Sequence, residues 1–266
     1  MGIADAPRTG NVLNLSWASL ASPSNPWLPP ADQQARLRLY CFPFAGGGPS
    51  IFASWRSQLA PDVAVCPLQL PGREARLRES PIPEIPGLVT ALANAIDSRL
   101  DSPYVFLGCS FGALLAYELT RELRHRGRPL PLRLIVVSHS APGWSRLPTM
   151  SHLSDADFIA ALQSRYEAIP AAILADPEVL GMFLPVLRAD FMALETYRHS
   201  PEAALPLPID AWYGSLDQTL TRDGVAAWAS HTTGSFALHE LPAGHFFQRD
   251  PRLIQHLRRQ LAEELA

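Results

Sequence analysis

The sequence predicts an α/β fold with a mostly parallel central sheet flanked by helices. Short apolar runs alternate with segments of helical periodicity through most of the chain, which is the pattern of parallel strands joined by crossover helices. Residues 132–137 are almost entirely apolar, as expected of a strand covered on both faces. The stretch 144–205 carries only helical patterns, which indicates a helical insertion in the sheet domain.

The composition excludes several classes of protein. At 266 residues the chain can bury a substantial core in one large domain, and we expect a monomer. A net charge of −3 leaves no basic excess to neutralise phosphates, which argues against a nucleic-acid partner. Three isolated cysteines show no zinc-site spacing and fit reduced thiols. Without a signal-peptide pattern or an apolar run of membrane-span length, we expect a cytoplasmic protein with no membrane partner.

The first half of the chain alternates between the two kinds of element. Residues 1–35 have no sustained period, so we expect an N-terminal extended arm from which Trp17 and Trp27 dock on the body. Beyond the arm, strands are expected at 36–42, 63–70 and 104–107, and helices at 51–59, 84–100 and 113–126. Gly127, directly after the last of these helices, is a typical C-cap residue.

The insertion divides the predicted sheet domain into residues 36–143 and 206–266. Within 144–205, a Ser-x-x-Asp cap signal opens a helix over 154–165, and Asp176 with the following proline opens a longer helix. In an α/β enzyme such an insertion commonly forms a lid over the site, and a plain packing element is the alternative.

Residues 108–112 read Gly-Cys-Ser-Phe-Gly, which is the pattern of a nucleophile elbow. An apolar strand pattern precedes this pentapeptide and a helical pattern follows it, as the motif requires. The two glycines leave room for a sharp turn that lifts the hydroxyl of Ser110 out of the sheet toward a base. The pentapeptide alone can arise by chance, so its function depends on partners elsewhere in the chain.

Two candidate partners follow later strand patterns. Asp217 comes after the expected strand 209–213, and His245 comes after the expected strand 235–241. Because the carboxyl ends of parallel strands meet at one edge of a sheet, these side chains and that of Ser110 should lie close together. The chain order Ser, Asp, His is the order of the α/β-hydrolase fold, which we therefore predict.

The predicted chemistry is nucleophilic catalysis by a Ser-His-Asp triad. Ser110 would attack a carbonyl carbon, His245 would take and return the proton, and Asp217 would hold the imidazole in the required tautomer. The backbone N–H groups of Phe111 and Ala45 would form the oxyanion hole. This chemistry requires no metal and no organic cofactor.

Other interpretations of these residues stay open at this stage. The Gly-rich turn after Ala45 could cradle a phosphate, but no Gly-Lys-Ser/Thr follows it. Asp210 and Asp223 compete with Asp217 for the role of the acid, and His139 either lines the site or is a structural histidine. Five further histidines have polar or strand settings that indicate surface positions: His125, His199, His231, His239 and His256.

Several motifs together resemble the type II thioesterases, the stand-alone α/β-hydrolases that accompany modular polyketide and nonribosomal peptide synthases. The likeness runs from about residue 36 to about residue 250. Besides the elbow, it includes the segments Cys-Phe-Pro-Phe-Ala-Gly-Gly at 41–47, Gln-Leu-Pro-Gly-Arg-Glu at 69–74, Leu-Pro-Val-Leu-Arg-Ala-Asp-Phe at 184–191 and Gly-His-Phe-Phe at 244–247.

The resemblance implies hydrolysis of acyl thioesters held on the phosphopantetheine arm of acyl or peptidyl carrier protein domains, removing misprimed or stalled chains. It also implies that Ser110, Asp217 and His245 are the triad and that 144–205 is a lid that shapes the acyl chamber. Around the substrate we place Phe44, Cys109, His139 and Phe246, although the thiol of Cys109 should point into the core behind the turn. A chain-releasing or cyclising acyltransferase and a small-substrate esterase share this triad, and a non-catalytic carrier-binding module is a third alternative.

Two features of the sequence qualify the resemblance. The family elbow reads Gly-His-Ser-Met-Gly, whereas this chain has Cys109 and Phe111, so we expect a difference in acyl preference at these positions. Five arginines could meet an acidic carrier protein or its phosphate, although solvated surface is the favoured interpretation for most of them: Arg73, Arg121, Arg124, Arg126 and Arg128. The segment 184–191 is expected to serve lid packing and not chemistry.

Overall fold

The computed structural model describes residues 25–30, 34–59, 61–144, 148–166, 169 and 171–265. Most of the expected N-terminal arm, including Trp17, lies outside the described residues. The part at 25–30 packs on the body, as expected for Trp27. The guanidinium of Arg76 lies 4.2 Å from the centre of the Trp27 ring, and the side chain of Leu28 is buried in the main core.

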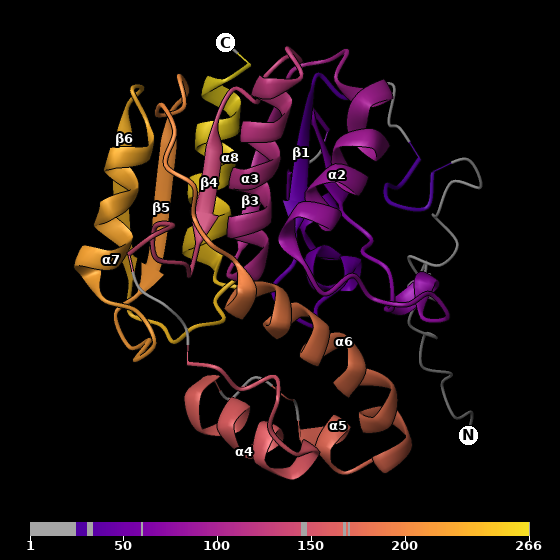
Figure 1. The fold of residues 1–266 in the computed structure, drawn as a ribbon. Coiled ribbons are helices and arrows are strands. Elements are labelled where there is room, and N and C mark those ends of the chain that lie inside the picture. Colours follow the sequence, from indigo (N-terminus) through magenta and orange to yellow (C-terminus); the bar gives the residue numbers. More distant parts are fainter. Residues whose placement is uncertain are drawn as a thin grey trace, which may run out of the picture.

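The described strands form one six-stranded sheet in the order β2-β1-β3-β4-β5-β6, and every neighbouring pair is parallel. The strands are β1 (Leu37–Phe42), β2 (Val63–Pro67), β3 (Tyr104–Cys109), β4 (Leu134–Val137), β5 (Ile209–Gly214) and β6 (Phe236–Leu241). All strands therefore end at the same edge, the lower edge in Figure 1. The predicted parallel α/β sheet is confirmed.

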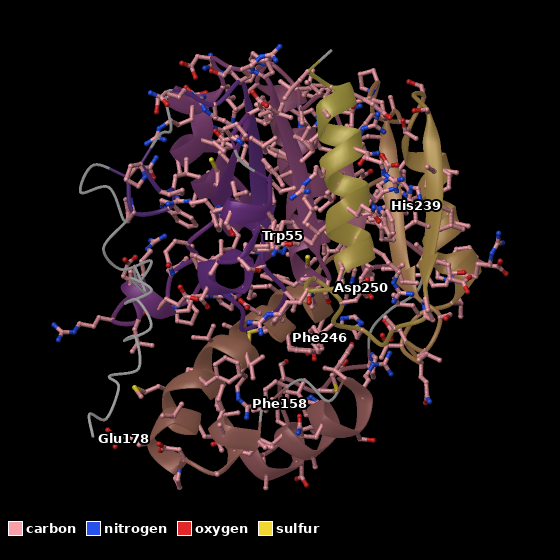
Figure 2. All side chains as sticks on the ribbon, turned by 180° about the vertical axis from the view of Figure 1, so that it is seen from behind. Trp55, Phe158, Glu178, His239, Phe246 and Asp250 are labelled. Carbon is pink, nitrogen blue, oxygen red and sulfur yellow. The ribbon has the colours of Figure 1, made fainter. Side chains whose placement is uncertain are left out.

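Helices cover both faces of the sheet and bury two separate cores. On one face lie α2 (Ile85–Ile96), α3 (Phe111–His125) and α7 (Arg222–Ala226), and on the other lie α1 (Trp55–Leu59) and α8 (Pro251–Glu263). Figure 1 looks onto α2 and α3, and Figure 2 looks from behind onto α8. Within the described residues, four 3₁₀ turns accompany these layers: Pro49–Phe52, Glu74–Arg76, Asp97–Arg99 and Ala227–His231.

Local caps explain where the helices begin and end. After α3 the backbone of Gly127 has φ +62°, and the N–H of Arg128 donates to the carbonyl of Leu123 at 2.9 Å, as in a Schellman cap. At the start of α8, the side chain of Asp250 accepts a hydrogen bond from the N–H of Arg252. Helix α7 is short because it tightens into a 3₁₀ turn at Ala227.

The described part of the chain between β4 and β5 forms three helices that lie beyond the edge at which the strands end (Figure 1). They are α4 (Asp155–Tyr166), α5 (Ala171–Leu174) and α6 (Pro177–Thr196), and Phe158, Leu162 and Phe191 are buried in their small core. The predicted boundaries of this insertion at residues 144 and 205 stay a prediction. No helix in the described part of the chain is both long and apolar enough to span a membrane.

Candidate active site

Ser110 occupies a strained turn between β3 and α3. Its φ of +52° and ψ of −116° are rare for a residue with a side chain, and its N–H donates to the carbonyl of Val137 on the neighbouring strand at 2.7 Å. The turn requires both glycines of the elbow. A Cβ atom on Gly108 would lie 2.2 Å from the carbonyl oxygen of Gly112, and one on Gly112 would lie 2.2 Å from that of Phe42. The backbone thus holds the hydroxyl at the end of the sheet.

The structure brings together the three side chains that the sequence placed beyond strand ends. The hydroxyl oxygen of Ser110 lies 3.0 Å from Nε2 of His245, and Nδ1 of His245 lies 2.6 Å from Oδ2 of Asp217. Asp217 follows β5 and His245 follows β6, so three different strand ends contribute. Both partners of the serine are 8 % exposed, whereas Ser110 itself is half-buried and reachable.

Neighbouring groups hold the side chain of Asp217 and the backbone of His245 in place. Burial alone would raise the pKa of Asp217, but hydrogen bonds from His245 and Thr219 outweigh it and hold that pKa below the usual value. The second carboxylate oxygen accepts from the N–H and the hydroxyl of Thr219 at 2.8 and 2.7 Å. The hydroxyl of Ser138 donates to the carbonyl of His245 at 2.7 Å. An ionised Asp217 favours the tautomer in which Nδ1–H donates to it and Nε2 accepts the proton of Ser110.

The two predicted oxyanion donors lie at the ends of β3 and β1. Phe111 is the first residue of α3, and Ala45 lines the same cavity as Ser110. Among the described residues, neither the N–H of Phe111 nor that of Ala45 donates to a protein acceptor. The turn around Ala45 is held from both sides, because the N–H of Gly47 donates to the carbonyl of Phe44 at 2.9 Å and the N–H of Gly46 donates to Asp190 at 2.7 Å.

Asp190 is a residue of this site that the sequence argument did not identify. It belongs to α6 and is fully buried, and it accepts two hydrogen bonds from Arg73, at 2.7 and 2.9 Å, besides the one from Gly46. The expectation that segment 184–191 serves lid packing and not chemistry stays a prediction, and Asp190 adds hydrogen bonds that fasten this segment to the turn around Ala45. In the sequence, the role of Asp190 is indicated only by the presence of an acid within an apolar helical stretch. Its partners Arg73 and Gly46 lie 117 and 144 residues away.

The five arginines considered as possible carrier contacts all form ion pairs within the chain. Arg73 is 5 % exposed and paired with Asp190, so it cannot meet a partner protein. Arg121 is 4 % exposed and paired with Glu118 and Glu202. The other three arginines also form ion pairs: Arg124 with Glu202, Arg126 with Glu122, and Arg128 with Asp97. Burial excludes Arg73 and Arg121 from contact with a carrier protein, whereas for the other three arginines, which are at least partly exposed, both readings stay predictions.

A cavity of about 610 Å³ opens above the three side chains, between the sheet edge and the insertion. Three of the four predicted lining residues are in its wall: Phe44, His139 and Phe246. The rings of Phe44 and Phe246 lie 4.7 Å apart, and Figure 2 shows Phe246 between the sheet and the lower helices. Helices α4 and α6 add an apolar wall that includes Tyr166, Leu187, Phe191 and Leu194.

Cys109 does not line this cavity, so its assignment as a lining residue is wrong. Its side chain is fully buried on the α8 face of the sheet, because side chains alternate between faces along β3. Burial raises the pKa of its thiol to about 12, which keeps the thiol protonated and unreactive. The ring of Phe111 is likewise fully buried, in the core on the other face. Neither departure from the family elbow reaches the cavity wall.

The other candidate acids and histidines lie elsewhere or act differently. Asp210 pairs with Arg133 and His239 and not with His245. His139 lines the cavity, and burial lowers its pKa to about 4, so it is neutral there. Of the five histidines expected at the surface, His125 is exposed, whereas the other four are only partly exposed and pack against aromatic rings: His199, His231, His239 and His256.

Comparisons with known proteins agree with this geometry. The family model of the thioesterase domain matches residues 37–261. The gramicidin S biosynthesis protein GrsT of Aneurinibacillus migulanus is 34 % identical over 247 residues, covering 91 % of this chain and 96 % of GrsT.

Two solved structures are similar in fold and sequence. RedJ, a thioesterase from the prodiginine biosynthetic pathway in Streptomyces coelicolor, superposes with a TM-score of 0.80 at 39 % identity, covering 87 % of this chain and 94 % of RedJ. YbtT, a type II thioesterase from the yersiniabactin NRPS/PKS pathway, superposes with a TM-score of 0.74 at 31 % identity, covering 89 % and 94 %. Together with the family match, they show that this chain belongs to the thioesterase domain family, has the α/β-hydrolase fold and is similar to type II thioesterases.

Proposed function

We propose that this protein hydrolyses acyl thioesters carried on the phosphopantetheine arm of carrier proteins, as an editing enzyme of a polyketide or nonribosomal peptide synthase. The observation that carries the proposal is the continuous hydrogen-bonded series from Ser110 through His245 to Asp217 at the base of an apolar-walled cavity. The similarity to type II thioesterases supports the substrate class.

In the proposed mechanism, the hydroxyl oxygen of Ser110 attacks the thioester carbon while Nε2 of His245 takes its proton. The N–H groups of Phe111 and Ala45 stabilise the oxyanion that forms. Collapse of the tetrahedral intermediate breaks the carbon–sulfur bond, and the imidazolium protonates the departing thiol. Water then attacks the acyl-serine with His245 again as the base, releasing the acid and the free hydroxyl.

The cavity supports the acyl part of the proposal. An acyl chain bound to Ser110 would lie against Leu187, Phe191 and Leu194 of α6, and removing that chain from water is favourable. The neutral His139 adds no charge to the wall. We accordingly propose that the insertion acts as a lid and shapes the acyl chamber.

The decisive variant is Ser110→Ala. We expect it to lower kcat for acyl-cysteamine thioesters and for acyl-loaded carrier proteins by about 10⁴-fold or more, the scale seen when a triad nucleophile is removed. Ser57→Ala removes an exposed hydroxyl of α1 that, within the described part of the chain, donates to the carbonyl of Ser54; it is the matched control and should leave turnover unchanged.

The products distinguish the proposed reaction from its alternatives. Mass spectrometry of a panel of acyl-loaded carrier proteins should detect free acids and unloaded carriers. Cyclic products would indicate a chain-releasing enzyme, and cleavage of oxygen esters alone would contradict the thioesterase proposal. Full turnover by Ser110→Ala would overturn the triad.

A further inference from the structure

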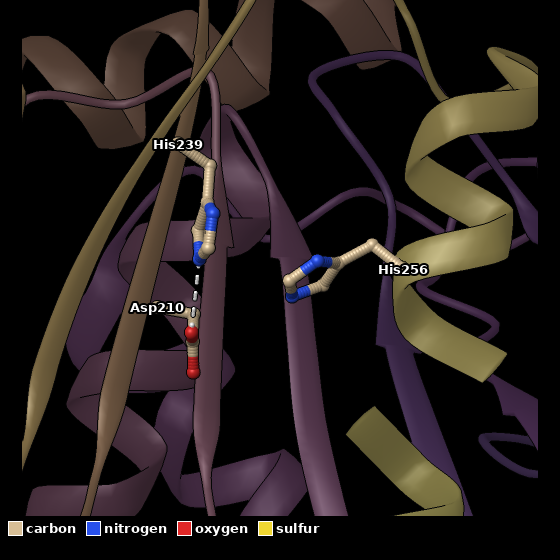
Figure 3. A group of neighbouring side chains, drawn as sticks. All are labelled: Asp210, His239 and His256. Atoms are coloured by element: carbon tan, nitrogen blue, oxygen red, sulfur yellow. Dashed lines mark hydrogen bonds and ion pairs between the residues drawn. The ribbon is translucent and has the colours of Figure 1, made fainter. Parts of the chain in front are cut away.

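A second cluster of titratable side chains lies away from the candidate active site, on the face of β5 and β6 that α8 covers. It consists of Asp210, His239 and His256, and Figure 3 shows the imidazole of His256 reaching from α8 toward the other two. One ligand atom from each residue lies within 4.8 Å of the others. Asp210 is the second residue of β5, whereas Asp217 follows the far end of that strand. The cluster is therefore distinct from the triad.

We propose that this cluster is a binding site for a divalent transition metal ion such as Zn²⁺, linking β5, β6 and α8. Two imidazole nitrogens and one carboxylate oxygen are the donor set that Zn²⁺ prefers. With metal–ligand bonds of about 2.0–2.2 Å, tetrahedral ligands are separated by about 3.4 Å. Nε2 of His239 and Oδ1 of Asp210 are already 3.1 Å apart, so only His256 must approach, by roughly an ångström.

An unsatisfied atom supports the proposal. Nε2 of His256 is buried and has no hydrogen-bond partner among the residues that the structure describes. Burying such an atom unpaired is unfavourable, and in native proteins it calls for a ligand or an unseen partner. A metal ion would accept its lone pair.

The surroundings orient the other ligands. The ring of His239 stacks on the indole of Trp212, with centroids 4.2 Å apart and planes 15° apart. Arg133 donates to Oδ2 of Asp210 at 2.6 Å and so leaves Oδ1 directed at His239. Carboxylates and imidazoles that neighbouring groups keep in one orientation are typical of metal sites, because the direction of each lone pair is then fixed.

The local charge also favours a cation. Asp210 and Glu264 both contact Arg133, so that this group carries one net negative charge. Around His256, the charges of Arg259 and Glu263 oppose one another.

The His239 side chain is 22 % exposed, which gives an ion a path from solvent. Binding through Nε2 requires His239 to carry its proton on Nδ1, a change of tautomer that consumes no other reactant.

The test uses the full-length protein stripped of metal by a chelator. Calorimetric titration with Zn²⁺ should show one site per chain, and at about 100-fold excess over the dissociation constant the melting temperature should rise by roughly 5–10 °C. Titration with Co²⁺ should give visible d–d absorption of tetrahedral intensity. Catalytic turnover should persist with the site filled, because the triad is separate.

His256→Gln is the informative variant, since His256 has no other hydrogen bond from this nitrogen and its loss should spare the fold. We expect at least a 100-fold weaker affinity and no thermal shift. His125→Gln, which removes an exposed histidine from the end of α3, is the matched control and should bind like the wild type. The proposal is overturned if the wild type binds no Zn²⁺ at millimolar concentration, or if His256→Gln binds as tightly as the wild type. Zinc inhibition that is insensitive to His256→Gln would place the ion at His245 and would also overturn it.

Discussion

Replacing Asp190 by Asn should lower the free energy of unfolding far more than replacing an exposed acid on the protein surface would. The carboxylate accepts three hydrogen bonds, one from Gly46 and two from Arg73, and both charged side chains are almost completely buried. An amide of the same shape offers only one acceptor oxygen and turns its NH₂ group toward a donor. Arg73 would then be a buried charge without a counter-ion.

The expected loss is about 3–5 kcal/mol, the usual cost of breaking a buried ion pair by removing one partner. This is a large part of a total stability that is commonly about 5–15 kcal/mol. With a urea m-value near 3 kcal/mol/M, the upper end of the usual range, the unfolding midpoint should fall by about 1–1.7 M. Tryptophan fluorescence measures that midpoint directly.

The matched control for Asp190→Asn is Asp155→Asn. Asp155 pairs with Arg188 at 2.6 Å within the same insertion, but its side chain is 71 % exposed, so its loss should cost less than about 1 kcal/mol. Adding Arg73→Met to Asp190→Asn should recover part of the loss, because the uncompensated charge disappears. A midpoint shift as small as that of Asp155→Asn, or strictly additive effects of the two changes, would refute this reasoning.

Two further outcomes are expected. Burial lowers the pKa of His139 to about 4 from the ordinary 6.5, so as the pH falls the imidazole becomes protonated in the unfolded chain before it does in the folded protein. The free energy of unfolding should therefore decrease between pH 6.5 and pH 4, by up to about 3 kcal/mol. Urea unfolding at several pH values should show a smaller decrease for His139→Gln, and an identical decrease would contradict the assignment. Cys109→Ala should keep kcat/KM within about threefold, since its thiol faces the core. A thiol reagent should modify Cys109 only after unfolding, and rapid labelling of the native protein would show that the thiol is accessible.

The sequence predicted those parts of the molecule that local patterns determine. The apolar run ending at Val137 and the cap at Gly127 specify their elements without reference to the rest of the chain. Ser110, Asp217 and His245 could be placed together because strand ends in a parallel sheet meet at one edge, whatever the details of packing.

The features of the fold and the site that could not be predicted depend on contacts between residues far apart in the sequence, which no local pattern reveals. Arg73 has the appearance of a surface charge until Asp190, 117 residues later, is placed beside it. Cys109 is an exception, because the alternation of side chains along β3 is local: it turns the thiol into the core, as expected, and away from the cavity. His256 was expected at the surface, since only the packing of α8 on the sheet shows that its ring meets Trp212.

The contact between Asp190 and Gly46 has a consequence for substrate selection. It fastens the middle of α6 to the turn that carries Ala45, so moving this part of the insertion away from the sheet would break the hydrogen bond that holds the proposed oxyanion donor. Leu187 and Phe191, which line the cavity from the same helix, are thereby tied to that turn. In the proposed acyl chamber, an acyl chain too bulky for this wall would also displace the proposed oxyanion donor, so the exclusion of large acyl groups and the loss of their hydrolysis would have the same cause.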